Sequence, residues 1–204
     1  MLKKIGIVIV GTFLMGSSFG LCLMSGLGAD SMSVLCMGTS IQLQMSVGVV
    51  SFGISLIMVV VTLFIDRKQF HVGTFISLIM ISIAIDMVMK LSLPESLLIR
   101  FIILIVAIVV IGFSSALVAS ANLGKGPYDA LIYGLEKKTG VSLVYWRYGI
   151  EAIFLVCGYL VGGVFGIGTI LSLLLVGPII DYSRKILKKV PFLNEEKVQK
   201  ESTK

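Results

Sequence analysis

Residues 97–119 read LLIRFIILIVAIVVIGFSSALVA, an apolar run in which Arg100 is the one charged residue. A helix needs about 20 apolar residues to cross the hydrocarbon core of a bilayer, so this run predicts a transmembrane helix. Five further runs have the same character, at about 5–27, 44–65, 71–91, 142–163 and 167–187. The chain is therefore predicted to be an all-α membrane protein with six transmembrane helices.

The composition supports this class. Of the 204 residues, 57% are hydrophobic and 14% are charged, whereas about 25% are charged in a typical soluble domain. Six spans use about 120 residues, which leaves no room for a soluble catalytic domain. The three cysteines lack metal-ligand spacing, and no nucleophile stands beside a base. We therefore expect no enzymatic activity, no metal and no cofactor.

The basic residues predict the orientation in the membrane. An even number of spans puts both termini on the same side of the membrane. If the N-terminus is inside, 15 of the 17 basic residues are also inside, and only Lys90 and Arg100 are outside. The positive-inside rule therefore predicts cytoplasmic N- and C-termini. Residues 188–204 are expected to form a basic cytoplasmic tail that contacts anionic lipid. Because topology accounts for these charges, nucleic acid is not expected as a partner.

The sequence also contains an internal repeat. When the sequence is aligned with itself at a shift of 96 residues, 13 of the 48 positions from 7 to 54 are identical. A shift of 95 residues then aligns the region that begins at residue 70 with the region that begins at residue 165. The predicted units are residues 1–96 and 97–187, each with three spans. An odd number of spans inserts the second unit upside down, as in the inverted repeats of many transporters.

A short helix is predicted after the first span of each unit. In the second unit the stretch NLGKGPYDALIYGL begins at Asn122, with Gly126 as the cap and Pro127 as the first helical residue. About 12 residues are too few to span a bilayer. The helix is either an amphipathic connector on the membrane surface or a re-entrant segment whose N-terminal N–H groups face a solute. The re-entrant interpretation makes Asn122, Gly124, Gly126 and Asp129 candidate binding residues.

Two aspartates occupy equivalent positions near the ends of the third and sixth spans. Asp86 and Asp181 are each followed four residues later by a lysine, Lys90 or Lys185. This spacing predicts an ion pair on one face of each helix. The pair either anchors the helix end or, as an ionisable group inside a span, belongs to a functional site.

Glu151 is the charged residue predicted to lie deepest in the membrane, about 14 Å into the fifth span at 1.5 Å per residue. Arg147 precedes it by four residues and can pair with it. Either the two form a structural pair within the helix, or Glu151 binds a cation or proton.

Three motifs together carry a family resemblance. The segments 124–135 (GKGPYDALIYGL), 166–170 (GIGTI) and 177–181 (GPIID) resemble the YczE/YitT-type family of bacterial integral membrane proteins. The resemblance implies a multi-pass protein of the bacterial plasma membrane whose family is biochemically uncharacterised. Tyr128 stands where many relatives carry tryptophan.

The functional hypothesis is a small-solute transporter with its site between the two units. The candidate site residues are Asn122, Gly124, Gly126, Asp129, Glu151, Asp181 and Asp86. The alternative is a membrane-embedded solute-binding or accessory subunit of a larger complex, without transport of its own. Glycines spaced four apart, such as Gly16 and Gly20, predict close helix packing, either within the bundle or in a homodimer.

Overall fold

The computed structural model describes residues 2–66, 71–121, 123 and 126–187. All of its regular structure in these ranges is helical, and each of the six apolar runs coincides with a helix. The helices are α1 (Leu2–Ser25), α2 (Ser31–Leu43), α3 (Val47–Ile65), α4 (Val72–Val88), α5 (Leu97–Ser120), α6 (Pro127–Thr139), α7 (Leu143–Leu160) and α8 (Ile167–Leu187).

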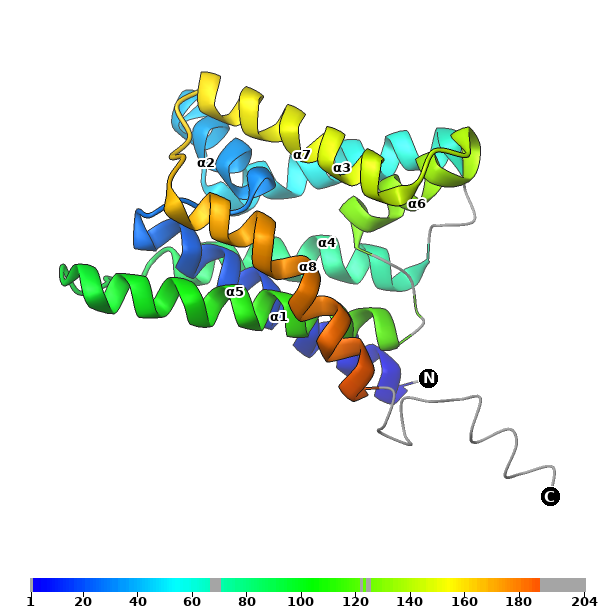
Figure 1. The fold of residues 1–204 in the computed structure, drawn as a ribbon, viewed down its shortest axis with the longest axis horizontal. Coiled ribbons are helices and arrows are strands. Elements are labelled where there is room, and N and C mark those ends of the chain that lie inside the picture. The colour runs from blue at the N-terminus through cyan, green and yellow to red at the C-terminus, as the bar shows by residue number, and fades with distance from the viewer. Residues whose placement is uncertain (1, 67–70, 122, 124–125, 188–204) are drawn as a thin grey trace.

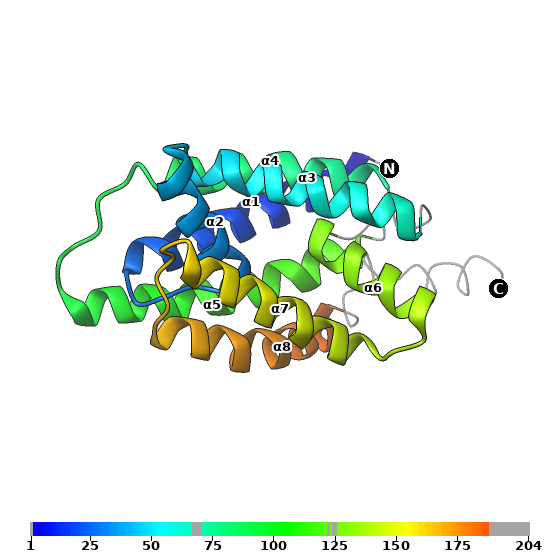
Figure 2. The ribbon, with the colours of Figure 1, turned by 90° about the horizontal axis from the view of Figure 1, so that it is seen from above.

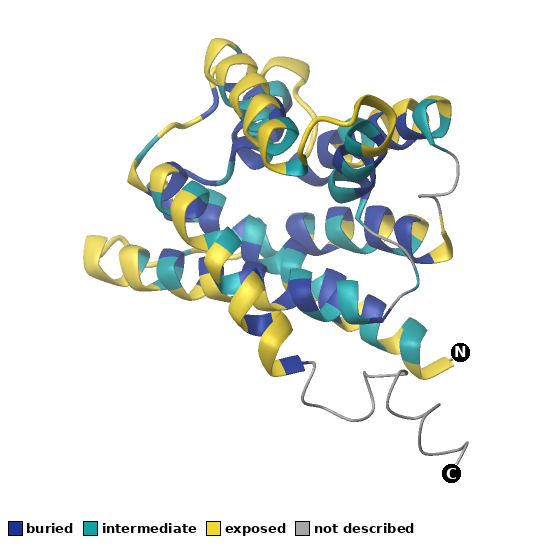
Figure 3. Ribbon diagram, turned by 45° about the vertical axis from the view of Figure 1, so that its right-hand side comes forward, coloured by how far each residue is buried: buried dark blue, intermediate teal, exposed yellow. Residues whose placement is uncertain are grey.

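Four of the described helices are long and apolar enough to cross a membrane, namely α1, α3, α5 and α7. At 17 residues, α4 is shorter. Large apolar side chains cover the outward faces, and on α7 the buried residues are Ile150 and Gly158 alone. Figure 3 shows the resulting bands of exposed residues along the outer helices. Such surfaces suit lipid, and the chain is a membrane protein.

The helices form two layers (Figures 1 and 2). In one layer α1 packs against α4 and α5, and α5 packs against α8. In the other layer α2 packs against α3 and α7, and α6 packs against α3 and α7. The main contact between the layers is that of α3 with α4. Each layer therefore contains helices from both halves of the chain.

Small residues allow the helices of the first layer to approach closely. A Cβ atom at Gly16 of α1 would lie 2.6 Å from the carbonyl oxygen of Ile81 and 2.9 Å from the Cβ of Ala84 on α4. At Gly112 of α5 it would lie 2.5 Å from a methyl group of Ile179 on α8. Gly16 aligns with Gly112 in the repeat, so the α1–α4 and α5–α8 contacts use equivalent positions. The predicted packing role of Gly16 is confirmed.

Two backbone hydrogen bonds connect the halves of the chain reciprocally. The N–H of Gly168, at the start of α8, donates to the carbonyl of Leu27 at 2.8 Å. The N–H of Gly73, at the start of α4, donates to the carbonyl of Leu123 at 2.9 Å. Leu27 aligns with Leu123, and Gly73 aligns with Gly168. The loop after the first long helix of each half is thus held by the last helix of the other half.

The close α1–α4 contact gives a stability prediction. Gly16→Ala should lower the unfolding free energy by about 1–3 kcal/mol, because the added methyl group overpacks the contact with α4. Gly53→Ala is the matched control in a helix interior, since nothing lies within 4 Å of a Cβ at that position. The control should be neutral or stabilising, because alanine favours helix over glycine. Thermal unfolding in detergent, followed by circular dichroism, measures both variants, and equal midpoints would contradict the contact.

Candidate solute site around Glu151

Glu151 of α7 accepts two hydrogen bonds inside the second layer. Its Oε1 receives one from the Tyr128 hydroxyl and one from the Arg147 Nε, each at 3.1 Å. The Glu151 side chain is 14% exposed and that of Arg147 is 30% exposed. The i, i+4 pair expected from the sequence is therefore present, and a tyrosine from another helix joins it.

Tyr128 reaches Glu151 because of how α6 begins. Gly126 is the cap residue in an extended conformation, and Pro127 is the first helical residue, as predicted. The Tyr128 ring then packs against Phe154, with the ring centroids 6.3 Å apart. Buried Leu131, Ile132 and Ile150 belong to the same apolar cluster. This packing holds the phenol beside the carboxylate.

Asp30 brings a second carboxylate toward the same region, although it is not among the site residues expected from the sequence. It caps α2, where Oδ2 accepts a hydrogen bond from the Ser33 N–H at 3.2 Å. Oδ1 is buried and has no hydrogen-bond partner among the described residues. Asp30 aligns with Gly126, the cap of α6, so the repeat placed it at the start of a short helix. That alignment was the signal that could have singled it out.

The electrostatics of these groups are coupled. Burial raises the pKa of the Asp30 carboxyl, the hydrogen bonds from Ser33 oppose this rise, and the nearby charge of Glu151 adds to it. Burial and the charge of Glu151 also raise the pKa of Tyr128, so the phenol stays protonated and donates. The charge of Asp129, in the first turn of α6, acts on both Tyr128 and Arg147. We call Asp30, Tyr128, Asp129, Arg147 and Glu151 the Glu151 cluster.

The Glu151 cluster thus contains three carboxylates and one guanidinium. The expected site residues Gly126, Asp129 and Glu151 lie in or beside it, whereas Asn122 and Gly124 fall outside the described residues. A carboxylate in an apolar bundle needs a proton, a cation or hydrogen bonds to offset its desolvation. The described residues contain no group of His, Cys, Asp and Glu arranged to hold a metal ion.

Asp86 lies elsewhere, and its expected pairing with Lys90 is wrong. The Asp86 carboxylate accepts from the Ser46 hydroxyl at 2.7 Å and from the Gly48 N–H at 2.8 Å, at the start of α3. Because α4 ends at Val88, Lys90 leaves the helical face that the spacing assumed. The free N–H groups and the positive dipole end of α3 bind the carboxylate instead.

Asp181 is exposed on α8, which packs against α5. The described structure shows no hydrogen bond or ion pair between Asp181 and Lys185, so this expected pair is also not formed. α8 is not among the main packing partners of α2, α6 or α7, the helices around the Glu151 cluster.

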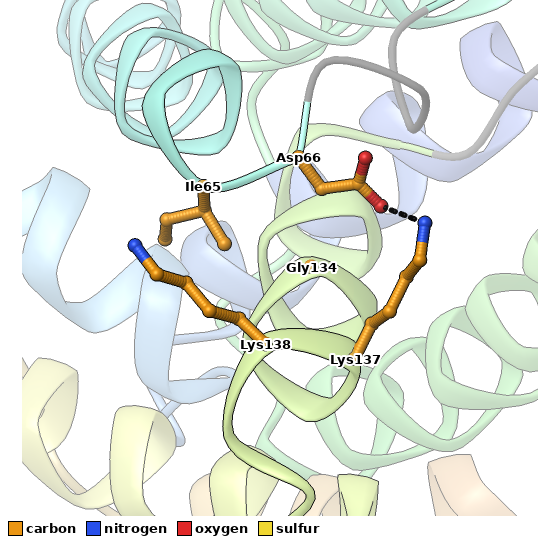
Figure 4. A pocket seen from close by; sticks show the side chains of 5 residues that line it. All are labelled: Ile65, Asp66, Gly134, Lys137 and Lys138. Carbon is orange, nitrogen blue, oxygen red and sulfur yellow. Dashed lines mark hydrogen bonds and ion pairs between the residues drawn. The ribbon is translucent and has the colours of Figure 1, made fainter.

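A shallow surface pocket of about 230 Å³ lies between α3 and α6. Its lining residues are Ile65, Asp66, Gly134, Lys137 and Lys138. In Figure 4 the Lys137 ammonium points to Asp66, and the two groups are 2.7 Å apart. This ion pair ties the end of α3 to α6, and thus supports the helix that carries Tyr128.

Comparison with known proteins identifies the relatives of the chain. An uncharacterised protein of Haemophilus influenzae is 31% identical over 196 residues, which is 96% of this chain and 89% of that protein. The uncharacterised membrane protein YczE of Bacillus subtilis is 30% identical over 141 residues, covering 68% of this chain and 65% of YczE. The uncharacterised protein YyaS of the same organism is 26% identical, over 88% of this chain and 92% of YyaS.

No solved structure matches the chain. The match to YczE confirms the resemblance read from the sequence motifs. A family model described as a family of unknown function, DUF6198, matches residues 2–185. This helical membrane protein belongs to the DUF6198 family.

Proposed function

We propose that the protein is a small-solute transporter of the bacterial plasma membrane, with six spans in two inverted repeats and both termini cytoplasmic. The observation that carries the proposal is the Glu151 cluster, a group of partly buried ionisable side chains at the contacts of α7 with α2 and α6. Ionisable residues inside membrane bundles are costly and mark substrate or proton pathways.

The contacts between the halves support the inverted repeats. The Leu27–Gly168 and Leu123–Gly73 hydrogen bonds join aligned residues in a reciprocal manner. The same relation connects the Gly16 contact on α4 with the Gly112 contact on α8. Such reciprocal contacts are expected of two units related by a pseudo-twofold axis. In this arrangement α4 and α8 are the third and sixth spans.

The charge balance favours a cationic species as the solute or the coupling ion. Asp30 and Glu151 are near enough for their charges to interact. Two interacting carboxylates in partly buried positions do not both ionise without cost, which favours uptake of a proton or a cation by one of them. Arg147 neutralises part of the remaining charge. A proton or an amine cation would complete this balance.

A second candidate function is a membrane-embedded accessory subunit that binds a solute or a partner without transporting alone. The observation that favours it is α7, which buries Ile150 and Gly158 and leaves the rest of its surface partly or fully exposed. A partner subunit or a second copy could cover that surface.

The proposed topology predicts opposite sidedness for the two short helices. A cysteine at Gln42, at the end of α2, should react with a membrane-impermeant maleimide added outside intact cells. A cysteine at Lys138, at the end of α6, should react after the membrane is opened. Both changes are made in a Cys157→Ser background, because Cys157 is the exposed native thiol among the described cysteines. Labelling of both positions from the same side would exclude inverted repeats.

The proposed site predicts that Glu151→Gln abolishes transport by the protein reconstituted alone into liposomes. The measurement is the current on a solid-supported membrane after concentration jumps of organic amines and amino acids, with Glu95→Gln in an exposed loop as the control. The control should keep the wild-type current, and both variants should insert normally. No current from the wild type, together with a co-purifying ATPase, would replace the transporter by the accessory subunit. Wild-type current from Glu151→Gln would remove Glu151 from the site.

A further inference from the structure

The contact between α3 and α4 is a clasp made by a few polar groups. The Asp86 carboxylate bridges the Ser46 hydroxyl and the Gly48 N–H, so the C-terminal turn of α4 is bound to the N-terminus of α3. Gly48 permits this approach, because a Cβ there would lie within 2.6 Å of the Asp86 carboxylate. We call Ser46, Gly48 and Asp86 the α3–α4 clasp.

The second half of the chain keeps the same polar groups without the contact. Ser46 aligns with Ser142 at the start of α7, and Asp86 aligns with Asp181 on α8. Ser142 makes no capping hydrogen bond with its side chain, and both residues are exposed. α7 and α8 are not among the helix pairs that pack together. Figure 1 shows the two helices diverging from the loop that joins them.

The α3–α4 clasp and the aligned ends of α7 and α8 lie at opposite ends of the molecule. The N-terminus of α3 and the C-terminus of α4 are at one end in Figure 2, and the N-terminus of α7 and the C-terminus of α8 are at the other. α3 and α7 belong to one layer, while α4 and α8 belong to the other. If the layers rock as units, closing one end opens the other.

We propose that Ser142 and Asp181 form an α7–α8 clasp in a second conformation, in which the α3–α4 clasp is open. The inference rests on the proposed inverted repeats and adds the pair of alternating contacts. The Ser142 hydroxyl and the positive dipole end of α7 would bind the Asp181 carboxylate, as the Ser46 hydroxyl and the start of α3 bind Asp86. The structure described here is the state with the α3–α4 clasp closed.

The small residues at the second clasp are exchanged between the helices. Val144 of α7 stands where α3 has Gly48, and Gly177 of α8 stands where α4 has Ser82. Ser82 is buried, whereas a Cβ at Gly177 would have no atom within 4 Å. A Cβ at Gly48 would overlap the backbone oxygen of Ser82 and the Asp86 carboxylate, so Val144 would keep α7 farther from α8 than α3 is from α4. The second clasp is therefore a wider contact, made by the Ser142 hydroxyl and the Asp181 carboxylate.

Pulsed electron paramagnetic resonance on the full chain in nanodiscs tests the exchange. One spin-label pair, Val49→Cys with Met87→Cys, reports on α3 and α4, and the aligned pair Tyr145→Cys with Tyr182→Cys reports on α7 and α8. All four side chains are exposed, and Cys157→Ser removes the accessible native thiol.

Asp86→Ala should lengthen the distance between α3 and α4 and shorten the distance between α7 and α8. The ratio of the two states should shift by about tenfold or more, since a hydrogen-bonded carboxylate is lost. Ser46→Ala, the milder change, should shift both distances in the same directions.

Asp181→Ala is the matched control, and it should leave both distances unchanged because its clasp is open in this state. Added to Asp86→Ala, it should reverse the shortening between α7 and α8. Separation of α3 from α4 with no change between α7 and α8 would overturn the exchange, and so would unchanged distances in both Asp86→Ala and Ser46→Ala. Shortening that persists without Asp181 would overturn the role of Asp181. No solute is needed, so these outcomes are independent of the flux measurement that tests transport itself.

Discussion

The fold depends on which groups hydrogen-bond to the backbone where the chain leaves a helix between α1 and α2 and between α5 and α6. Between α1 and α2, and again between α5 and α6, N–H and C=O groups lie outside regular helix and need partners that lipid does not supply. Leu27 and Leu123 receive theirs from Gly168 and Gly73, the first turns of α8 and α4. One carbonyl at each break is thus hydrogen-bonded by a helix of the other half, which ties the two halves together.

The same constraint fixes where the short helices start. Gly28 has a φ of +97°, and a Cβ atom there would lie 2.7 Å from the Gly166 N. This glycine lets the chain pass beside the start of α8 and reach the cap of α2 two residues later. Asp30 is thereby placed at the cap of α2, with one oxygen on the helix N-terminus and the other buried and unpartnered in the described structure. A backbone requirement thus sets the position of the Asp30 carboxylate.

Local sequence relations predicted the features that depend on one helix. The apolar runs predicted the long helices, Gly126 and Pro127 predicted the start of α6, and the spacing of Arg147 and Glu151 predicted their ion pair. The glycine spacing did predict the close packing of Gly16, but the partners that charged groups find on other helices were not predicted. The spacing of Asp86 and Lys90 assumed a helix that continues to residue 90, whereas the start of α3 binds Asp86 and α4 ends first.

The Glu151 cluster shows how the repeat halves have diverged. Arg147 and Glu151 on α7 align with Ser51 and Ser55 on α3, which are buried hydroxyl residues without charge. Conversely, Asp30 at the cap of α2 aligns with Gly126 at the cap of α6. Each half therefore has a carboxylate where the other half has a neutral residue.

The carboxylates of Asp30 and Glu151 come from different elements, the cap of α2 and the middle of α7. The packing of α2 against α7 therefore controls the distance between them. A shift of α7 relative to α2 within their layer would change the electrostatic coupling of the two carboxylates, and with it the affinity for a proton or a cation.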